Sequence, residues 1–317
     1  MTKFTDVAVI GAGTMGHALA LVHALGGCNV RLQDVDAAAL AKAPALVEAA
    51  LATLVDAGAV TAAERDAAVA RIVCTPDLAE AAAAADLVVE AVFEDPDIKR
   101  EVFARLDRCA RPDAVIASNT SHLDVFPLVP DSRQERVLIA HWYTPPYILD
   151  LVDIAPGPRT RPEIVAGVSA FYEGLGKVPV VFKSFLAGYI ANRLQAAIGL
   201  EVYHLLDEGL VTAEDIDRSI IHGLATRLAT LGHVMKMDYT GLDMARRSLA
   251  HRPYKPPEPR RQSPTLDRLV AAGRTGVMAG AGFYDYGGRS PAELFAERDR
   301  KLLKLKQVLA QLEGRKA

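Results

Sequence analysis

A histidine and an aspartate in the middle of the chain have the types and the setting to move a proton together. His141 ends an apolar run, Val137–His141, and precedes two aromatic residues and a Pro-Pro turn. Asp153 lies twelve residues on, inside the apolar segment 149–156, where a carboxylate needs a partner. A histidine can take a hydroxyl proton near neutral pH, and a carboxylate on its other nitrogen fixes the tautomer and stabilises the imidazolium. Alone, His141 would more often be a packed core residue, but Asp153 favours a general base.

A glycine motif near the start of the chain could hold a dinucleotide. Gly11, Gly13 and Gly16 form G-x-G-x-x-G directly after a predicted strand and before a predicted helix. Such glycines permit a tight turn, close approach to a diphosphate and close helix–strand packing, and the helix N-terminus favours the negative charge. Asp34 ends the next predicted strand, where a carboxylate accepts from a ribose diol and repels a 2′-phosphate. We therefore expect NAD rather than NADP; the alternative is a glycine turn in another kind of α/β protein.

The elements that must position these residues alternate between strands and helices in the first half of the chain. The predicted strands are Asp6–Ile10, Val30–Gln33, Leu87–Val92, Ala114–Ser118 and Val137–His141. Helices are expected at Met15–Leu25 and Ala37–Ala57, and Thr61 with Glu64 forms a capping-box pattern that opens another. This alternation predicts a parallel sheet covered on both faces, with its ligands at the carboxyl ends of the strands.

The second half of the chain is predicted to be helical. After a last β-rich run at Lys177–Lys183, helices are expected at Tyr189–Glu208, Ala213–His222, Leu231–Ala250 and Pro291–Leu312, with a surface loop at His251–Pro264. We therefore expect an α/β Rossmann dinucleotide-binding domain over residues 1–187, followed by an all-α C-terminal domain over residues 188–317.

Composition excludes several other classes of protein. The 317 residues carry 36 basic and 39 acidic side chains, and this net charge of −3 gives no reason to expect nucleic acid or an anionic membrane as a partner. The three cysteines are widely spaced, which predicts neither disulfides nor a metal site and fits a reducing compartment. No run approaches the about 18 uninterrupted apolar residues of a membrane helix. We expect a cytoplasmic protein.

Taken together, the motifs resemble the 3-hydroxyacyl-CoA dehydrogenase family over almost the whole chain. The matching segments are GAGTMG at 11–16, VEAVFED at 89–95, SNTS at 118–121, the histidine, aromatic and proline pattern at 141–145, LVDI at 151–154, GYIANR at 188–193, EDID at 214–217, YTGLD at 239–243 and GAGFYDY at 280–286. The resemblance implies NAD-dependent oxidation of a 3-hydroxy group on an acyl-CoA or free acid. It also implies a homodimer formed through the helical domain.

The family's site residues can be carried over to matching positions. His141 matches the general base and Asp153 the carboxylate that orients it, while Ser121 and Asn192 match the pair that contacts the substrate oxygen and the nicotinamide region. The resemblance adds further residues that bind the cofactor or line its cleft: Thr14, Met15, Glu94, Lys99 and Asn119. Other interpretations remain open, namely a turn hydroxyl for Ser121, a helix cap for Asn192 and a solvated helix-start pair for Glu94 and Lys99.

Departures from the family pattern bear on the substrate. Asp153 stands where glutamate is usual, and Thr144 where asparagine is usual. Phe185 and Ala187 replace an aspartate and a proline, and Met278 replaces a common lysine. Together these changes suggest a substrate other than the usual fatty acyl-CoA.

An arginine in the second half suggests a free acid. Arg227 follows the segment 223–226, as a basic residue does in the gulonate dehydrogenase and lambda-crystallin branch, and an arginine can clamp a carboxylate through two parallel hydrogen bonds. We hypothesise that Arg227 binds a substrate carboxylate; a surface arginine is the alternative. Two functional alternatives also remain, a dehydrogenase that uses Lys183 as its base and a non-catalytic, crystallin-like NAD-binding protein.

Overall fold

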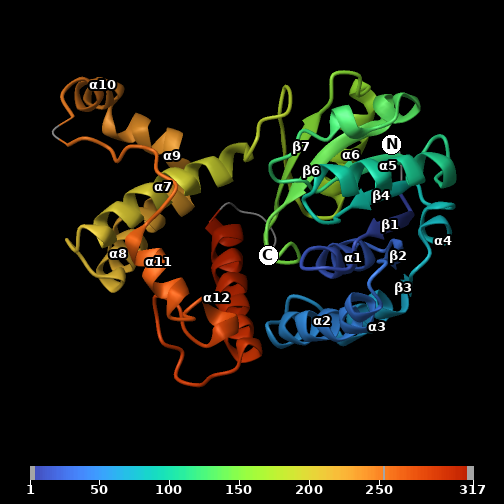
Figure 1. Ribbon diagram of the computed structural model, residues 1–317, viewed down its shortest axis with the longest axis horizontal. Coiled ribbons are helices and arrows are strands. Elements are labelled where there is room, and N and C mark those ends of the chain that lie inside the picture. Colours follow the sequence, from blue (N-terminus) through green and yellow to red (C-terminus); the bar gives the residue numbers. More distant parts are fainter. Residues whose placement is uncertain (1–3, 253, 313–317) are drawn as a thin grey trace. The chain divides into compact units, whose positions relative to one another are not determined.

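The computed structural model describes residues 4–252 and 254–312, and the chain divides into two compact units (Figure 1). The first unit is Met1–Tyr189 and contains the sheet, while the second, Ile190–Ala317, is helical. The architecture is therefore the predicted one, a Rossmann-like α/β domain followed by a helical domain.

An eight-stranded sheet forms the centre of the described part of the first unit. Its strands are β1 (Asp6–Ile10), β2 (Asn29–Gln33), β3 (Ile72–Thr75), β4 (Leu87–Glu90), β5 (Val115–Ser118), β6 (Val137–Trp142), β7 (Leu151–Pro156) and β8 (Val178–Val181). Their order is β3-β2-β1-β4-β5-β6-β7-β8, so the chain moves outward from β1 to β3 and then crosses to β4 on the other side of β1. This reversal opens a crevice at the carboxyl ends of β1 and β4, where such sheets bind ligands.

The sheet is parallel except at one pair. The β6 and β7 strands run antiparallel, whereas β7 and β8 are parallel to each other. The expectation of a wholly parallel sheet is therefore wrong at this pair. The connection between the two strands, residues 143–150, is shorter than the dozen or so residues that a parallel crossover needs.

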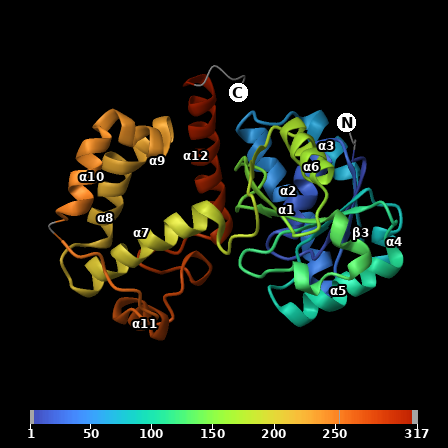
Figure 2. The same ribbon diagram turned by 90° about the horizontal axis from the view of Figure 1, so that it is seen from above.

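Helices cover both faces of the sheet, as predicted. They are α1 (Gly16–Leu25), α2 (Ala37–Asp56), α3 (Ala62–Ala70), α4 (Leu78–Ala82), α5 (Pro96–Cys109) and α6 (Pro162–Gly174), with short 3-10 segments at Phe126–Leu128 and Asp131–Arg136. Figure 2 shows α3 and α6 on one side of the first unit and α4 and α5 on the other. Each face has its own buried cluster: Leu19 and Val168 belong to one, and Leu78 and Phe103 to the other.

Two helices of this unit bear on earlier expectations. The capping box at the start of α3 is confirmed, because Glu64 N donates to Thr61 Oγ1 and Thr61 N donates to Glu64 Oε2. Among the described helices, α2 is long and apolar enough to cross a membrane by length and composition alone. The core helix of a folded domain passes the same test; 33% of the apolar window of α2 is buried, including Ala43 and Leu51.

The second unit consists of helices joined by loops. They are α7 (Tyr189–Asp207), α8 (Ala213–Ser219), a π-helical segment (Ile220–Ala225), α9 (Thr226–Thr240), α10 (Leu242–Ala250), α11 (Pro264–Ala271), a 3-10 segment (Val277–Ala279) and α12 (Pro291–Leu312). The predicted loop at His251–Pro264 is irregular in its described residues up to the start of α11. The predicted helix Leu231–Ala250 is two helices, because Gly241 has a φ of 95° and separates α9 from α10.

Candidate active site

The three motif glycines lie between β1 and α1, and two of them are required by close backbone contacts. Gly11 has a φ of +100°, and a Cβ there would lie 2.5 Å from the carbonyl oxygen of Ala91. A Cβ on Gly16 would lie 1.6 Å from Gly11 O, whereas one on Gly13 would meet open space. Within the described chain, no side chain caps the start of α1 and no acidic residue stands in its first turn. This helix start therefore fits a bound diphosphate.

Asp34 lies beside the same loop, at the carboxyl end of β2. Its Oδ2 accepts a hydrogen bond of 2.6 Å from the Ala12 amide, and its Oδ1 accepts one of 2.9 Å from the Asp36 amide. These bonds fix the carboxylate next to the glycine motif, where a ribose is expected. On the other side of the motif, Thr144 Oγ1 lies 3.0 Å from the sulfur of Met15. Thr14, the remaining motif residue, is exposed.

The histidine and aspartate singled out in the sequence lie directly opposite each other. His141 on β6 pairs with Asp153 on β7 in the antiparallel register, and the two side chains are only 3% and 1% exposed. His141 Nδ1 is 3.6 Å from Asp153 Oδ2, which is longer than a hydrogen bond. The same carboxylate oxygen accepts a 2.6 Å hydrogen bond from the hydroxyl of Tyr143. The two predicted residues therefore lie side by side, and Tyr143 donates a hydrogen bond to the carboxylate of the pair.

The other ring nitrogen of the histidine faces Ser121. His141 Nε2 is 3.2 Å from Ser121 Oγ, so the two predicted site residues are in hydrogen-bond contact. Tyr189 stacks on the imidazole at 4.4 Å between ring centroids, and its hydroxyl donates to Thr120 O at 2.6 Å. Burial, with the nearby carboxylates of Glu94 and Asp153, raises the pKa of Tyr189, so this phenol stays a neutral donor. The imidazole is thus stacked on its face by Tyr189 and contacted at Nε2 by Ser121.

Glu94 holds the loop that carries the serine. Its Oε1 accepts hydrogen bonds from Thr120 Oγ1 and from the Ser121 and His122 amides, at 2.8, 2.8 and 2.9 Å. Burial opposes its ionisation, but these donors and nearby Lys99 outweigh that effect and hold the pKa of Glu94 below its ordinary value. The glutamate expected to line the cofactor and substrate cleft therefore also positions Ser121.

Lys99 takes part in a buried ion pair. Its Nζ lies 2.7 Å from Glu90 Oε1 and 3.4 Å from Glu94 Oε2, and the side chain is 1% exposed. Glu90 is fully buried and also accepts from the Ser118 hydroxyl and the Val92 amide. The interpretation of Glu94 and Lys99 as a solvated helix-start pair is therefore wrong for Lys99. The role of Lys99 in cofactor binding stays a prediction. The geometry adds a structural role, the neutralisation of the buried Glu90 carboxylate.

Asn119 joins the carboxyl ends of neighbouring strands. Its backbone amide donates to the backbone oxygen of Glu90 at 2.8 Å, and its side-chain Oδ1 accepts from the backbone amide of Trp142 at 2.9 Å. Both bonds hold the segment 118–121 against the end of β6. Asn119 thus lies on the edge of the sheet that carries the glycine motif and His141.

Two predicted substrate residues belong to the second unit. Asn192 is in the first turn of α7, past its N-terminal residue Tyr189, so it is not the helix cap that was considered as an alternative. Arg227 is exposed in the first turn of α9, where its Nε donates to Gly223 O at 2.9 Å. It lies on a helix and not on a loop. Their contacts with substrate stay predictions.

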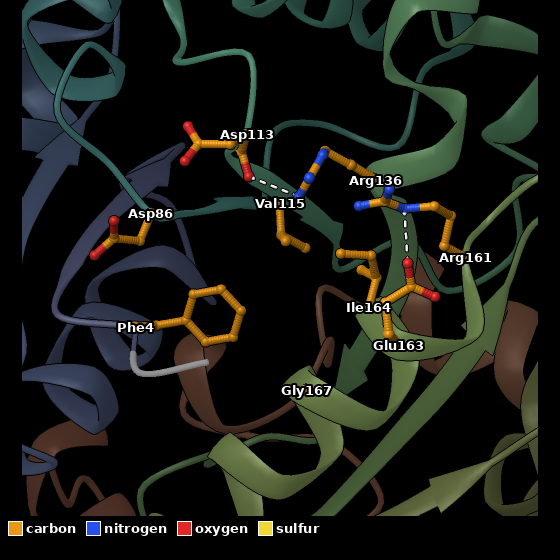
Figure 3. A pocket seen from close by; sticks show the side chains of 9 residues that line it. All are labelled: Phe4, Asp86, Asp113, Val115, Arg136, Arg161, Glu163, Ile164 and Gly167. Carbon is orange, nitrogen blue, oxygen red and sulfur yellow. Dashed lines mark hydrogen bonds and ion pairs between the residues drawn. The ribbon is translucent and has the colours of Figure 1, made fainter. Parts of the chain in front are cut away.

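A cavity of about 260 Å³ lies at the opposite edge of the sheet (Figure 3). Phe4, Asp86, Asp113 and Arg136 line it, and each precedes the start of a parallel strand. Because ligands of such sheets bind at the carboxyl ends, this cavity is separate from the candidate site. Among the described residues, no group of three or more histidine, cysteine or acidic side chains is arranged to hold a metal ion.

Several residues of the site were not identified from the sequence. Glu90 is a carboxylate that ends the buried run Leu87–Glu90, and the argument applied to Asp153 would have found it. Tyr143 and Tyr189 carried no such signal, because their contacts depend on strand register and on the conformation of the chain before α7.

Comparisons with known proteins show the family of the chain. The family model described as "3-hydroxyacyl-CoA dehydrogenase, NAD binding domain" matches residues 6–185, and the model of the C-terminal domain of the same family matches residues 188–286.

Individual relatives match over most of their length. An L-carnitine dehydrogenase from Streptomyces coelicolor is 34% identical, covering 96% of this chain and 95% of the relative. A 3-hydroxybutyryl-CoA dehydrogenase from Mycobacterium tuberculosis is 33% identical, covering 88% and 98%. The crystal structure of 5-formyl-3-hydroxy-2-methylpyridine 4-carboxylic acid 5-dehydrogenase, an NAD⁺-dependent dismutase, superimposes with a TM-score of 0.87 at 29% identity, covering 99% of this chain and all of that one.

Proposed function

The chain belongs to the 3-hydroxyacyl-CoA dehydrogenase family of NAD-dependent dehydrogenases, and from this premise we propose that it oxidises the 3-hydroxy group of a small acid or acyl thioester with His141 as the general base. The observation that carries the proposal is the buried His141, which faces Asp153 with one nitrogen and Ser121 with the other.

The cofactor is held by the residues around the glycine motif. Gly11 and Gly16 set the turn, the open space over Gly13 would admit the diphosphate, and Asp34 would accept a hydrogen bond from the ribose. The carboxylate of Asp34 favours NAD over NADP because it repels a 2′-phosphate. When bound, NAD supplies the acceptor for the hydride that leaves the alcohol carbon.

His141 has the geometry of a base whose proton acceptor is Nε2. With the proton of the neutral ring on Nδ1, toward Asp153, Nε2 carries the lone pair. A substrate hydroxyl within reach of both Nε2 and Ser121 Oγ can pass its proton to the imidazole as hydride departs. The buried carboxylate of Asp153 then stabilises the imidazolium. Ser121, held by Glu94, orients the oxygen, and this positioning contributes to the rate.

The substrate class that we favour is a free hydroxy acid. The L-carnitine dehydrogenase and the pyridine carboxylic acid dehydrogenase are both named for substrates with a free carboxylate. Arg227 could bind such a carboxylate, and Asn192 could hold the substrate oxygen with Ser121. The 3-hydroxybutyryl-CoA dehydrogenase keeps a thioester as the second candidate. We also propose a homodimer, which sedimentation equilibrium would test.

A substrate panel tests the reaction. The purified protein is incubated at fixed NAD with free 3-hydroxy acids and with 3-hydroxyacyl-CoA thioesters, and NADH formation is followed. His141→Gln should lower kcat by about 100-fold or more with little change in NAD affinity, and the exposed His251→Gln serves as the matched control. Near-full turnover in His141→Gln would disprove the base. Lys183→Met should retain activity; a loss there but not in His141→Gln would favour the lysine alternative.

A matched pair of arginine variants tests the carboxylate contact. Arg227→Ala should raise KM for the preferred free acid by about 10-fold or more, because a bidentate arginine–carboxylate contact is lost. Arg246→Ala, an exposed arginine of the same unit, should leave KM unchanged. An unaltered KM in Arg227→Ala would remove this residue from the substrate site.

A further inference from the structure

The carboxylate of Asp153 lies within reach of two groups, and the hydroxyl of Tyr143 holds it more closely. The Tyr143 hydroxyl lies 2.6 Å from Asp153 Oδ2, whereas His141 Nδ1 is 3.6 Å from the same oxygen. Among the described residues, Nδ1 is buried without a hydrogen-bond partner. The strong, charge-assisted hydrogen bond of this carboxylate is therefore made to the phenol and not to the imidazole.

The length of the aspartate side chain explains this arrangement. His141 and Asp153 are directly opposite on neighbouring strands, so the backbone fixes the separation of their Cα atoms. The aspartate side chain is short, and its Oδ2 stops 3.6 Å from Nδ1. A carboxylate that is 1% exposed still needs a donor, and Tyr143 supplies one.

We infer that Tyr143 is a positioning residue for the proposed proton transfer: its hydroxyl fixes the Asp153 carboxylate and weakens the attraction of that carboxylate for the His141 imidazolium. The inference rests on the proposed role of His141 as the base. The neutral imidazole is the form that accepts the substrate proton.

The other groups around the imidazole are not altered by removing this hydroxyl. Tyr189 stacks on the ring and remains neutral, and Ser121 contacts Nε2. Glu94 lies behind the serine loop, 3.4 Å from Lys99 Nζ, which also pairs with Glu90 at 2.7 Å. Tyr143→Phe keeps the edge-to-face ring contact with His141, at 4.6 Å between centroids, and removes only the hydroxyl. The cycle with Asp153→Asn then assigns a change in the titration of His141 to the Tyr143–Asp153 bond.

The test measures the pKa of His141 by ¹⁵N NMR, with His141→Gln used to assign the signal, and also the pH profile of kcat/KM for oxidation. In Tyr143→Phe the carboxylate is free to attract the imidazolium, so the pKa of His141 should rise by ~1 unit and the acid limb of the profile should move upward with it. Tyr172→Phe removes a phenol hydroxyl next to Trp142, in the cluster on the other face of β6, and should move neither. A titration that is unchanged or lowered in Tyr143→Phe would overturn the inference.

A double-mutant cycle tests whether the effect passes through Asp153. In an Asp153→Asn background, Tyr143→Phe should no longer shift the pKa of His141, since the charge that the hydroxyl controls is absent. A shift of the same size in that background would show that Tyr143 acts on the imidazole directly, contrary to the inference. If His141→Gln retains turnover, the proposed base fails; if it is inactive while Tyr143→Phe titrates like the wild type, only the role of Tyr143 fails.

Discussion

Replacing Lys99 by methionine should destabilise the first unit strongly. The change leaves the carboxylate of Glu90, which is fully buried, without the ammonium group that now lies 2.7 Å away. Breaking a buried ion pair by removing one partner costs roughly 3–5 kcal/mol. Glu90 would keep the Ser118 hydroxyl and the Val92 amide as donors, so we expect the low end, about 3 kcal/mol.

Urea denaturation can measure this loss of stability specifically for the first unit of the chain. The only tryptophan of the chain, Trp142, lies on β6, so its fluorescence reports the unfolding of the sheet domain. Lys99→Met should lower the midpoint without changing the slope, whereas Lys42→Met, at an exposed position of α2, should change stability by less than about 0.5 kcal/mol.

A second variant separates the charge from the loss of packing. Adding Glu90→Gln to Lys99→Met removes the unpaired charge and should recover part of the lost stability. The reasoning fails if Lys99→Met costs under about 1 kcal/mol, since a buried pair is worth more than an exposed one. Loss of NAD affinity with unchanged stability would instead place Lys99 in the cofactor site, as the family resemblance implied.

Three further predictions concern the cofactor loop and acid stability. Gly16→Ala should lower both the urea midpoint and NAD affinity, because its Cβ would lie 1.6 Å from Gly11 O. Gly13→Ala should weaken NAD binding and leave the urea midpoint unchanged, because its Cβ would meet open space. Equal urea midpoints in the two variants would contradict this. Asp34→Asn should reduce the ratio of kcat/KM for NAD to that for NADP, and a constant ratio would exclude a role in ribose selection. Burial lowers the pKa of His23 from 6.5 to about 4, so between these pH values the folded state binds fewer protons than the unfolded state. The free energy of unfolding should therefore fall by up to about 3 kcal/mol as the pH drops from 6.5 to 4. The same dependence of stability on pH in a His23→Phe variant would refute this.

Long or strongly patterned elements could be predicted from the sequence, whereas short edge strands could not. The bounds of β1 and α12 agree with the prediction, and α1 differs by one residue. The β3 strand escaped notice because Ile72–Thr75 is a four-residue edge strand whose two central residues are exposed, so it has no buried apolar run. The helices α5 and α6 were also not identified, although each has a proline in its first turn, which is a start signal that could have been used.

The site was predictable where burial demanded a partner, and unpredictable where register decided the contact. Asp153 in an apolar run pointed to His141, and the pair forms. Glu90 followed from the same physics but was overlooked. The buried state of Lys99 could not be foreseen, because a lysine in the first turn of an amphipathic helix is usually exposed and only the packing of α5 on the sheet encloses it.

The antiparallel hairpin explains why Tyr143, among the aromatic residues near the base, reaches the aspartate. Side chains alternate along an extended chain, so residues 141 and 143 share one face while Trp142 enters the cluster on the other. Asp153 lies directly opposite His141, and a residue two positions along the same face is its diagonal neighbour, within reach of a long side chain. A glutamate in a strand of this register would extend toward the imidazole, whereas the shorter aspartate leaves room that a phenol hydroxyl can fill. The length of the Asp153 side chain and the hydroxyl of Tyr143 are therefore coupled, and Asp153→Glu or Tyr143→Phe alone should each lower kcat/KM.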